Sequence, residues 1–185
     1  MNHLATSKED ILAASRDLIK ENGWAAVSIR AVASRCSVSA GTIYNYYESK
    51  ADLLSDTIES IWHEIFFHPE DEQVFHDVES CISWIYERLE YGNRQFPGFF
   101  SLHSFGFMRD EKTSGKKRMM KTWGHILNGL CEVLENDPKV RAVVFDQEFT
   151  EKKFADILFS LILVSMIRQD YDPSSVLMLV KKTLY

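Results

Sequence analysis

The sequence has few of the residues that mark secreted, membrane or metal-binding proteins. Its 185 residues include only three cysteines, Cys36, Cys81 and Cys131, whose spacing matches neither a disulfide framework nor a metal site. The longest apolar stretch, residues 154–167, is shorter than the roughly 20 residues of a membrane span. The N-terminus lacks a signal-peptide pattern. These absences predict reduced thiols, no metal or cofactor, no membrane partner and a cytoplasmic location.

Proline is also scarce, and no segment alternates between apolar and polar residues as a half-buried strand would. The four prolines fall where periodic segments begin or end, at positions 69, 97, 138 and 173. We therefore expect an all-α protein of about nine helices. Two domains are predicted: residues 1–49, a three-helix domain with a helix-turn-helix, and residues 50–185, a larger helical bundle to which the fourth helix connects.

Serine precedes each helix that the periodicity predicts in the first domain. A serine at this position caps a helix by accepting a hydrogen bond from a backbone N–H, and an acid three residues later completes a capping box. The pattern predicts helices over about 8–22, 29–36 and 40–46, with a fourth starting near 50, capped by Ser7, Ser28, Ser39 and Ser49. The short turn between the second and third helices is typical of a helix-turn-helix.

Acidic residues are absent from residues 22–47, the longest such stretch in the chain. Small and hydroxyl side chains at the start of a short helix suit entry into a major groove and contact with phosphates. Residues 1–50 carry a net charge of +1, from 6 basic and 5 acidic side chains, whereas the whole chain carries −6. The acidity therefore belongs to the second domain and does not exclude DNA as a partner of the first.

The segment from about Glu9 to Leu54 resembles the DNA-binding domain of TetR-family transcriptional regulators. The spacing of the matching residues follows the family pattern without a gap. These residues are Gly23, Ser28, Val32-Ala33, Val38-Ser39, Gly41-Thr42-Ile43-Tyr44, Tyr46-Tyr47, Ser49-Lys50 and Leu53-Leu54. The resemblance implies phosphate contacts for Ser28, Tyr44 and Lys50. It places Arg30, Ala40, Gly41 and Asn45 near base edges, and it adds groove-wall or phosphate contacts for Ser39, Thr42 and Tyr46.

Several positions leave alternatives open. Ser37 stands where the family commonly has glycine, and a left-handed serine there would cost about 1 kcal/mol. Ala40 stands where many members have a longer polar or basic side chain, so the operator sequence is undetermined. Tyr47, and less readily Tyr44, could be a packing residue. Arg35 could form an ion pair instead of contacting DNA.

Residues 154–167 are apolar on all sides of a predicted helix, so both of its faces should be buried. A second subunit would bury the outer face, and the alternative is a core helix in a monomer. The resemblance agrees with a homodimer, because members of the family commonly dimerise through their last two long helices. The predicted interface consists of Phe154, Ile157, Leu158, Leu161, Ile162, Val176 and Val180.

The middle of the chain is rich in aromatic residues, which suits an apolar cavity for a small molecule. Aromatic residues at helical spacing are also ordinary core, so the pocket is implied by the resemblance and not by the spacing. The predicted pocket residues are Trp62, Phe66, Phe99, Phe100, His103 and Trp123. The expected effector is a small apolar or aromatic molecule.

Together these features predict a homodimeric, ligand-responsive repressor that binds a near-palindromic operator in double-stranded DNA, in the bacterial cytoplasm and associated with the nucleoid. One alternative is an activator or repressor without a small-molecule inducer. Another is a structural dimer that does not bind DNA. An enzyme is disfavoured, because the sequence has no recognisable pairing of a nucleophile with a base, no metal-ligand spacing and no phosphate-binding loop.

Overall fold

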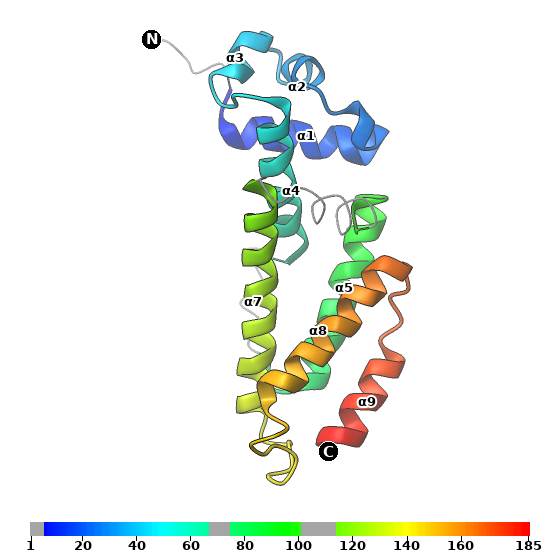
Figure 1. The fold of residues 1–185 in the computed structure, drawn as a ribbon. Helices are drawn as coiled ribbons and strands as arrows, with labels where there is room; N and C mark the ends of the chain where they lie inside the picture. Colours follow the sequence, from blue (N-terminus) through cyan, green and yellow to red (C-terminus); the bar gives the residue numbers. More distant parts are fainter. Residues whose placement is uncertain (1–5, 67–74, 101–113) are drawn as a thin grey trace. The chain divides into compact units, whose positions relative to one another are not determined.

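The computed structural model describes residues 6–66, 75–100 and 114–185, with only the backbone for residues 114–122 (Figure 1). These residues form helices and no strands, which confirms the all-α class. The helices are α1 (Lys8–Asn22), the short 3-10 helix η1 (Trp24–Ala26), α2 (Ile29–Arg35), α3 (Ala40–Tyr44), α4 (Lys50–Phe66), α5 (Val78–Gln95), α7 (Ser114–Asn136), α8 (Glu151–Arg168) and α9 (Ser174–Leu184).

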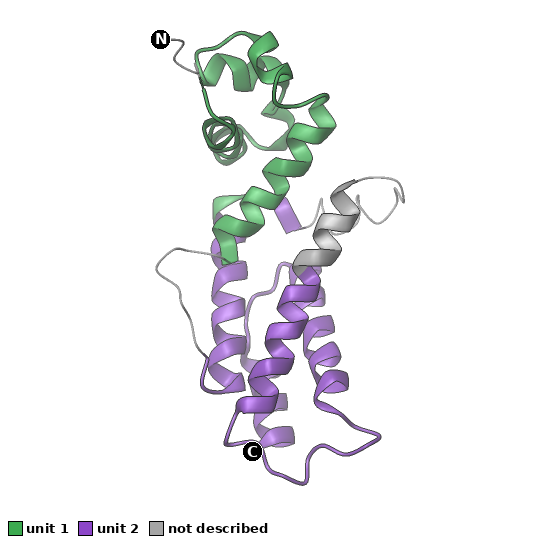
Figure 2. Ribbon diagram, turned by 90° about the vertical axis from the view of Figure 1, so that its left-hand side faces the viewer, with its two compact units in different colours: residues 1–68, 95–97 green, residues 69–94, 98–185 purple. Residues whose placement is uncertain are grey.

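The chain folds into two compact units (Figure 2). Unit 1 contains residues 1–68 and 95–97, and unit 2 contains residues 69–94 and 98–185. The predicted boundary at residue 49 therefore differs from the division by packing, which places all of α4 in unit 1. The reason is the apolar face of α4, whose Leu53, Ile61 and Ile65 are fully buried and which lies in contact with α1.

Helix starts in unit 1 follow the serine caps. Ser7 and Asp10 form a complete capping box, in which the Asp10 N–H donates to Ser7 Oγ at 3.1 Å and the Ser7 N–H donates to Asp10 Oδ2 at 2.9 Å. The hydroxyls of Ser28, Ser39 and Ser49 each accept a backbone N–H three residues on, at 3.1–3.2 Å. At each of these four helix starts, a serine that the sequence identifies thus accepts one of the backbone N–H groups that have no partner within the helix.

Ion pairs fasten α1 to α4 around the buried apolar contact. Glu64 on α4 accepts from both Arg16 at 2.8 Å and Lys20 at 2.6 Å. Lys8, in the first turn of α1, pairs with Asp56 at 2.6 Å. All three basic residues of α1 are therefore neutralised by acids of α4. The pairing joins the first and last helices of unit 1.

In unit 2, Asp137 joins three segments that are distant in sequence. Its buried carboxylate follows the last turn of α7 and accepts the N–H of Val78 at 2.9 Å, where α5 begins. The same carboxylate accepts the hydroxyl of Tyr185, the last residue after α9. An ion pair between Lys139 and Asp77, at 2.7 Å, lies beside this contact. The polar groups at this end of unit 2 therefore fix the start of α5 and the end of α9.

The bounds of α1, α2 and α3 and the start of α4 agree with the predicted helices to within two residues. The periodicity also predicts a fifth helix from about residue 71, whereas the described residues 75–77 are not helical and α5 begins at Val78. Asp77 is the physical reason, because its carboxylate accepts the N–H of Ser80 at 2.8 Å and so caps the helix. No helix within the described part of the chain is long and apolar enough to cross a membrane.

Acidification should weaken the contact between Asp77 and Lys139. The Lys139 ammonium, followed by the Ser80 N–H and hydroxyl, lowers the pKa of Asp77 from its ordinary 3.8 to about 2. A lowered pKa stabilises the fold above about pH 4, and this contribution is lost as the pH falls towards 2. We expect Asp77→Asn, which keeps a capping oxygen, to lower the free energy of unfolding by at most about 1 kcal/mol at pH 7.

Urea unfolding at pH 7, 4 and 2.5 measures this difference, with Glu87→Gln as the matched exposed carboxylate on α5. The difference between the wild type and Asp77→Asn should shrink between pH 4 and 2.5. A difference that stays constant across this range would contradict the role of the ion pair.

Candidate DNA-binding surface

The turn between α2 and α3 is closed by two backbone hydrogen bonds. The N–H of Ser37 donates to the carbonyl of Ser34 at 3.1 Å, and the N–H of Val38 donates to the carbonyl of Ala33 at 2.9 Å. Ser37 itself is left-handed, with φ of 56°. This is the Schellman arrangement, in which the left-handed position usually belongs to glycine. Ser37 therefore adopts the strained, left-handed conformation, which the sequence alone could not decide.

Helix α3 has one buried and one exposed side. Ile43 is fully buried, and Tyr47, just after the helix, is 4% exposed, so Tyr47 is a packing residue. Tyr44 is 56% exposed, the only large apolar side chain in the described part of unit 1 that is exposed to this degree. Gly41 and Asn45 are also exposed. The exposed side of α3 thus presents the positions for which the sequence predicts contacts with DNA.

Three predicted DNA-contact hydroxyls are also helix caps or neighbours of caps. Ser28 begins α2 and Ser39 begins α3, each bonded to a backbone N–H of its own helix. The hydroxyls of Ser39 and Thr42 lie 3.1 Å apart. Ala40 is half-buried in the first turn of α3. The side chains of Ser28, Ser39 and Thr42 therefore hold local structure, and their hydroxyl oxygens can accept further hydrogen bonds.

The basic residues of the first 50 positions divide into paired and unpaired groups. Lys8, Arg16 and Lys20 pair with α4, and Arg35 pairs with Glu21 through two hydrogen bonds, one of 2.8 Å. Arg35 lowers the pKa of Glu21, and Arg35 is thus an ion-pair residue, the alternative that the sequence left open. Within the described residues, Arg30 and Lys50 are exposed and form no ion pair.

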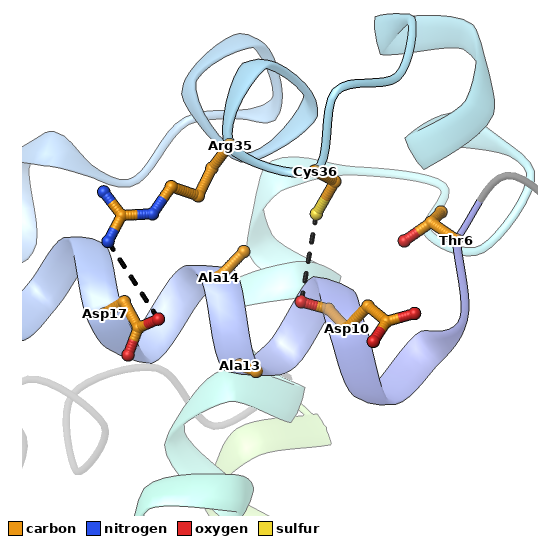
Figure 3. Close-up of a pocket in the computed structure, with 7 residues that line it drawn as sticks. All are labelled: Thr6, Asp10, Ala13, Ala14, Asp17, Arg35 and Cys36. Carbon is orange, nitrogen blue, oxygen red and sulfur yellow. Dashed lines mark hydrogen bonds and ion pairs between the residues drawn. The ribbon is translucent and has the colours of Figure 1, made fainter.

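A hollow of about 350 Å³ lies between α1 and the end of α2 (Figure 3). Its lining includes Thr6, Asp10, Arg35 and Cys36. The Cys36 thiol donates to the carbonyl of Asp10 at 3.8 Å, as drawn in the figure. Burial is the main cause that raises the pKa of Cys36, so the thiol stays protonated and keeps its donor. The hollow therefore marks where the helix-turn-helix rests on the first turn of α1.

Tyr46, for which the resemblance implies a groove-wall or phosphate contact, uses its hydroxyl within unit 1. Its hydroxyl donates to the backbone carbonyl of Thr6 at 2.7 Å, and the side chain is half-buried. Sequence reasoning missed this interaction, because Thr6 lies 40 residues away and precedes the first helix. No local pattern links these two positions.

The residues of the predicted dimer interface on α8 and α9 differ in their exposure. Phe154, Leu158, Ile162, Val176 and Val180 are at most 7% exposed within the single chain. Leu161 is half-buried. The apolar side chains that do reach the surface on these helices are Ile157, Val164, Ile167, Met178 and Leu179, with exposures from 37% to 57%.

The predicted ligand residues fall into separate groups. In unit 1, the rings of Trp62 and Phe66 on α4 stack at 5.8 Å and are buried. In unit 2, buried Phe99 and Phe100 form an edge contact at 5.3 Å. Half-buried Trp123 meets Phe159 edge-on at 5.8 Å. His103 lies outside the described residues.

Two buried polar atoms near the aromatic residues of unit 2 have no hydrogen-bond partner among the described residues. They are the indole N–H of Trp123 and the hydroxyl of Tyr171, whose ring lies 6.2 Å from that of Phe100. Burial raises the pKa of Tyr171 to about 12. Sequence reasoning did not select Tyr171, which stands just after α8. The described residues contain no group of three or more potential metal ligands.

The fold and the exposed surface of α2, α3 and the start of α4 define a helix-turn-helix protein with a separate helical unit. Residues 11–57 match the family model of bacterial regulatory proteins, tetR family. Residues 11–57 therefore match the DNA-binding segment of this family, in agreement with the resemblance in sequence. The HTH-type transcriptional regulator UidR of Escherichia coli K12 is 38% identical over 48 residues, 26% of this chain. This match spans about a quarter of the length of UidR, 24%.

Solved structures share the fold over most of the chain. A transcriptional regulator from Rhodococcus sp. Rha1 has a TM-score of 0.65 and 19% identity, covering 91% of this chain and 86% of that one. The transcriptional regulator FadR from Bacillus subtilis, in complex with stearoyl-CoA, has a TM-score of 0.64 and 19% identity, covering 97% and 100% of the two chains. At this identity the two structures establish the two-unit helical fold of unit 1 and unit 2.

Glycine at position 37 should stabilise unit 1. The left-handed backbone of Ser37 costs about 1 kcal/mol that glycine avoids, and the greater entropy of glycine in the unfolded chain offsets part of the gain. We expect Ser37→Gly to raise the free energy of unfolding by about 0.5 kcal/mol. Ser34→Gly, inside α2, is the matched control and should lower it by about 0.5 kcal/mol. Urea titration checks both signs, and a destabilised Ser37→Gly would contradict the strain.

Proposed function

We propose that this protein regulates transcription as a homodimeric repressor, which binds a near-palindromic operator and releases it when a small molecule binds. The observation that carries the proposal is the distribution of charge in unit 1. Four of the six basic residues in positions 1–50 are neutralised within the chain. The two that remain exposed and unpaired among the described residues, Arg30 and Lys50, are positions at which the family contacts DNA.

The surface around these two cations suits a duplex. Lys50 is the first residue of α4, where the partial positive charge of the helix terminus adds to its ammonium. Tyr44 and Asn45 are exposed at the end of α3 and offer hydrogen bonds to phosphates or base edges. The acidic balance of unit 2 gives that unit no comparable affinity for phosphates. DNA therefore fits unit 1 better than unit 2.

Two copies of the surface are needed, because one helix-turn-helix reads too few base pairs for useful specificity. The exposed apolar residues of α8 and α9 supply a surface for a second copy. Ile157, Leu161 and Val164 follow each other at intervals of three and four, and Met178 with Leu179 lies on α9. Exposed apolar side chains that gather on one face of a helix mark interaction surfaces. A twofold axis at this face would pair two recognition helices with two half-sites.

The aromatic residues of unit 2 support a small apolar or aromatic effector. The Trp123 indole N–H and the Tyr171 hydroxyl are buried donors without partners among the described residues, and a bound molecule with an acceptor would satisfy them. A chain of similar fold, FadR of Bacillus subtilis, binds stearoyl-CoA. An effector that binds one arrangement of unit 2 more tightly would weaken DNA binding, and DNA would weaken effector binding equally.

Selection from a random duplex library at about 100 mM salt tests DNA binding. We expect a near-palindrome to be enriched. The double variant Lys50→Glu/Tyr44→Ala should lose about 100-fold or more in affinity for that duplex, because it removes a phosphate-binding charge and an exposed aromatic contact. The control Lys152→Glu/Tyr91→Ala changes the same charge at exposed positions of unit 2 and should bind like the wild type. Equal losses in both double variants would refute the assignment of the surface.

A charge within the exposed apolar face of α8 should separate the subunits. Val164→Glu would bury two unpaired carboxylates in each dimer, so we expect the Kd of the dimer to rise by about 100-fold or more. Val143→Glu is the control, since Val143 is 88% exposed and lies in the loop between α7 and α8. Sedimentation equilibrium measures both, and an unchanged dimer with Val164→Glu would exclude this face.

Addition of effector candidates to the complex with the selected duplex distinguishes the repressor from a regulator without an inducer. Stearoyl-CoA is a defined first probe, and small aromatic compounds form the rest of the panel. Release of the duplex by the wild type, reduced in a Tyr171→Phe variant, would support a ligand site in unit 2. Binding that no compound in a broad panel alters would favour the alternative of a regulator without an inducer.

A further inference from the structure

Tyr46 stands two residues beyond the exposed Tyr44, yet its hydroxyl is used inside the protein. The hydroxyl donates to the Thr6 carbonyl at 2.7 Å, in a half-buried position. A tyrosine hydroxyl has one hydrogen to donate, and a phosphate oxygen can only accept. Tyr46 therefore cannot bond a phosphate without giving up Thr6. Tyr44, which is 56% exposed, has no such conflict.

Helix α3 needs support of this kind because it contains only five residues. An isolated helix of that length is unstable in water, since its few hydrogen bonds do not offset the cost of nucleation. Its inner side is held by Ile43 and Tyr47, which are buried. These apolar contacts resist separation of α3 from the core, but they define its rotation and tilt less precisely than a directional hydrogen bond does.

The directional contacts to α3 converge on the start of α1. Before α3, the Cys36 thiol donates to the Asp10 carbonyl (Figure 3). After α3, the Tyr46 hydroxyl donates to the carbonyl of Thr6. Thr6 directly precedes the capping box and Asp10 is one of its two residues, so the acceptors belong to a segment that is itself fixed. A short O–H···O bond is stronger than a thiol contact at 3.8 Å, which makes Tyr46 the principal anchor.

We propose that Tyr46 is a positioning residue for DNA recognition, which acts through the Thr6 carbonyl and not on the DNA. It seats α3 on the segment that enters α1, so that Tyr44 and Asn45 meet the groove in a defined orientation. This inference rests on the proposed function. It also makes Thr6, just before α1, part of the DNA-recognition apparatus, although Thr6 is distant from the helix-turn-helix in sequence.

Two single-atom changes on neighbouring tyrosines test the proposal with the duplex that the wild type selects. Tyr46→Phe and Tyr44→Phe are compared by three measurements at a temperature where circular dichroism shows each variant folded. The first is the affinity for the duplex. The second is the interference with protein binding that ethylation of each single phosphate causes. The third is amide hydrogen exchange of residues 45–47 without DNA. The amides of Tyr46 and Tyr47 bond the carbonyl of Ile43 and so report on α3.

Tyr46→Phe should lose about fivefold in affinity, retain interference at every phosphate, and exchange the amides of residues 45–47 about fivefold faster, the loss expected for one hydrogen bond. Tyr44→Phe should lose affinity together with interference at one phosphate in each half-site, and its exchange should match the wild type. Interference lost at one phosphate with Tyr46→Phe, unchanged affinity, or unchanged exchange would each overturn the positioning role. A wild type that selects no duplex would overturn the proposed function itself, and the positioning role with it.

Discussion

The recognition surface depends on how a helix of five residues is held in place. Helix α3 is too short to be stable alone, so tertiary contacts must fix the orientation of Tyr44 and Asn45. Burial of Ile43 and Tyr47 supplies the attraction, and the left-handed turn at Ser37 sets the angle at which α3 leaves α2. The strain at Ser37 is a small local cost for a turn that the surrounding contacts determine.

The charges of unit 1 follow from the same need to fix its helices. The basic residues of α1 are used to hold α4, and Arg35 is used to hold α2 against Glu21. The exposed cations Arg30 and Lys50 then lie at the starts of α2 and α4. With so few exposed cations, one copy of unit 1 contributes only a weak attraction to phosphates, and salt weakens it further. The acidity of the whole chain is thus compatible with a DNA-binding unit.

Local rules made unit 1 predictable from sequence, and their limits explain what was missed. The serine caps gave the starts of α1 to α4, because capping depends on residues three positions apart. Tyr46 and Thr6 lie 40 residues apart, beyond any such rule. On α8, hydrophobicity on all sides hides which face is internal, so the pattern alone places Leu158 and Ile162 at a subunit interface, although both are buried within the chain. Trp62 and Phe100 similarly could be core or pocket by pattern alone, and the structure buries both.

We propose that DNA lies on the surface formed by α2, α3 and the first turn of α4. Amide hydrogen exchange of the full chain, with and without a duplex that it binds specifically, measures this directly. Slower exchange on adding the duplex should concentrate at residues 28–31 and 39–52, with little change at α8 and α9. Slowing confined to unit 2, or spread equally over the exposed side of α1, would contradict the account.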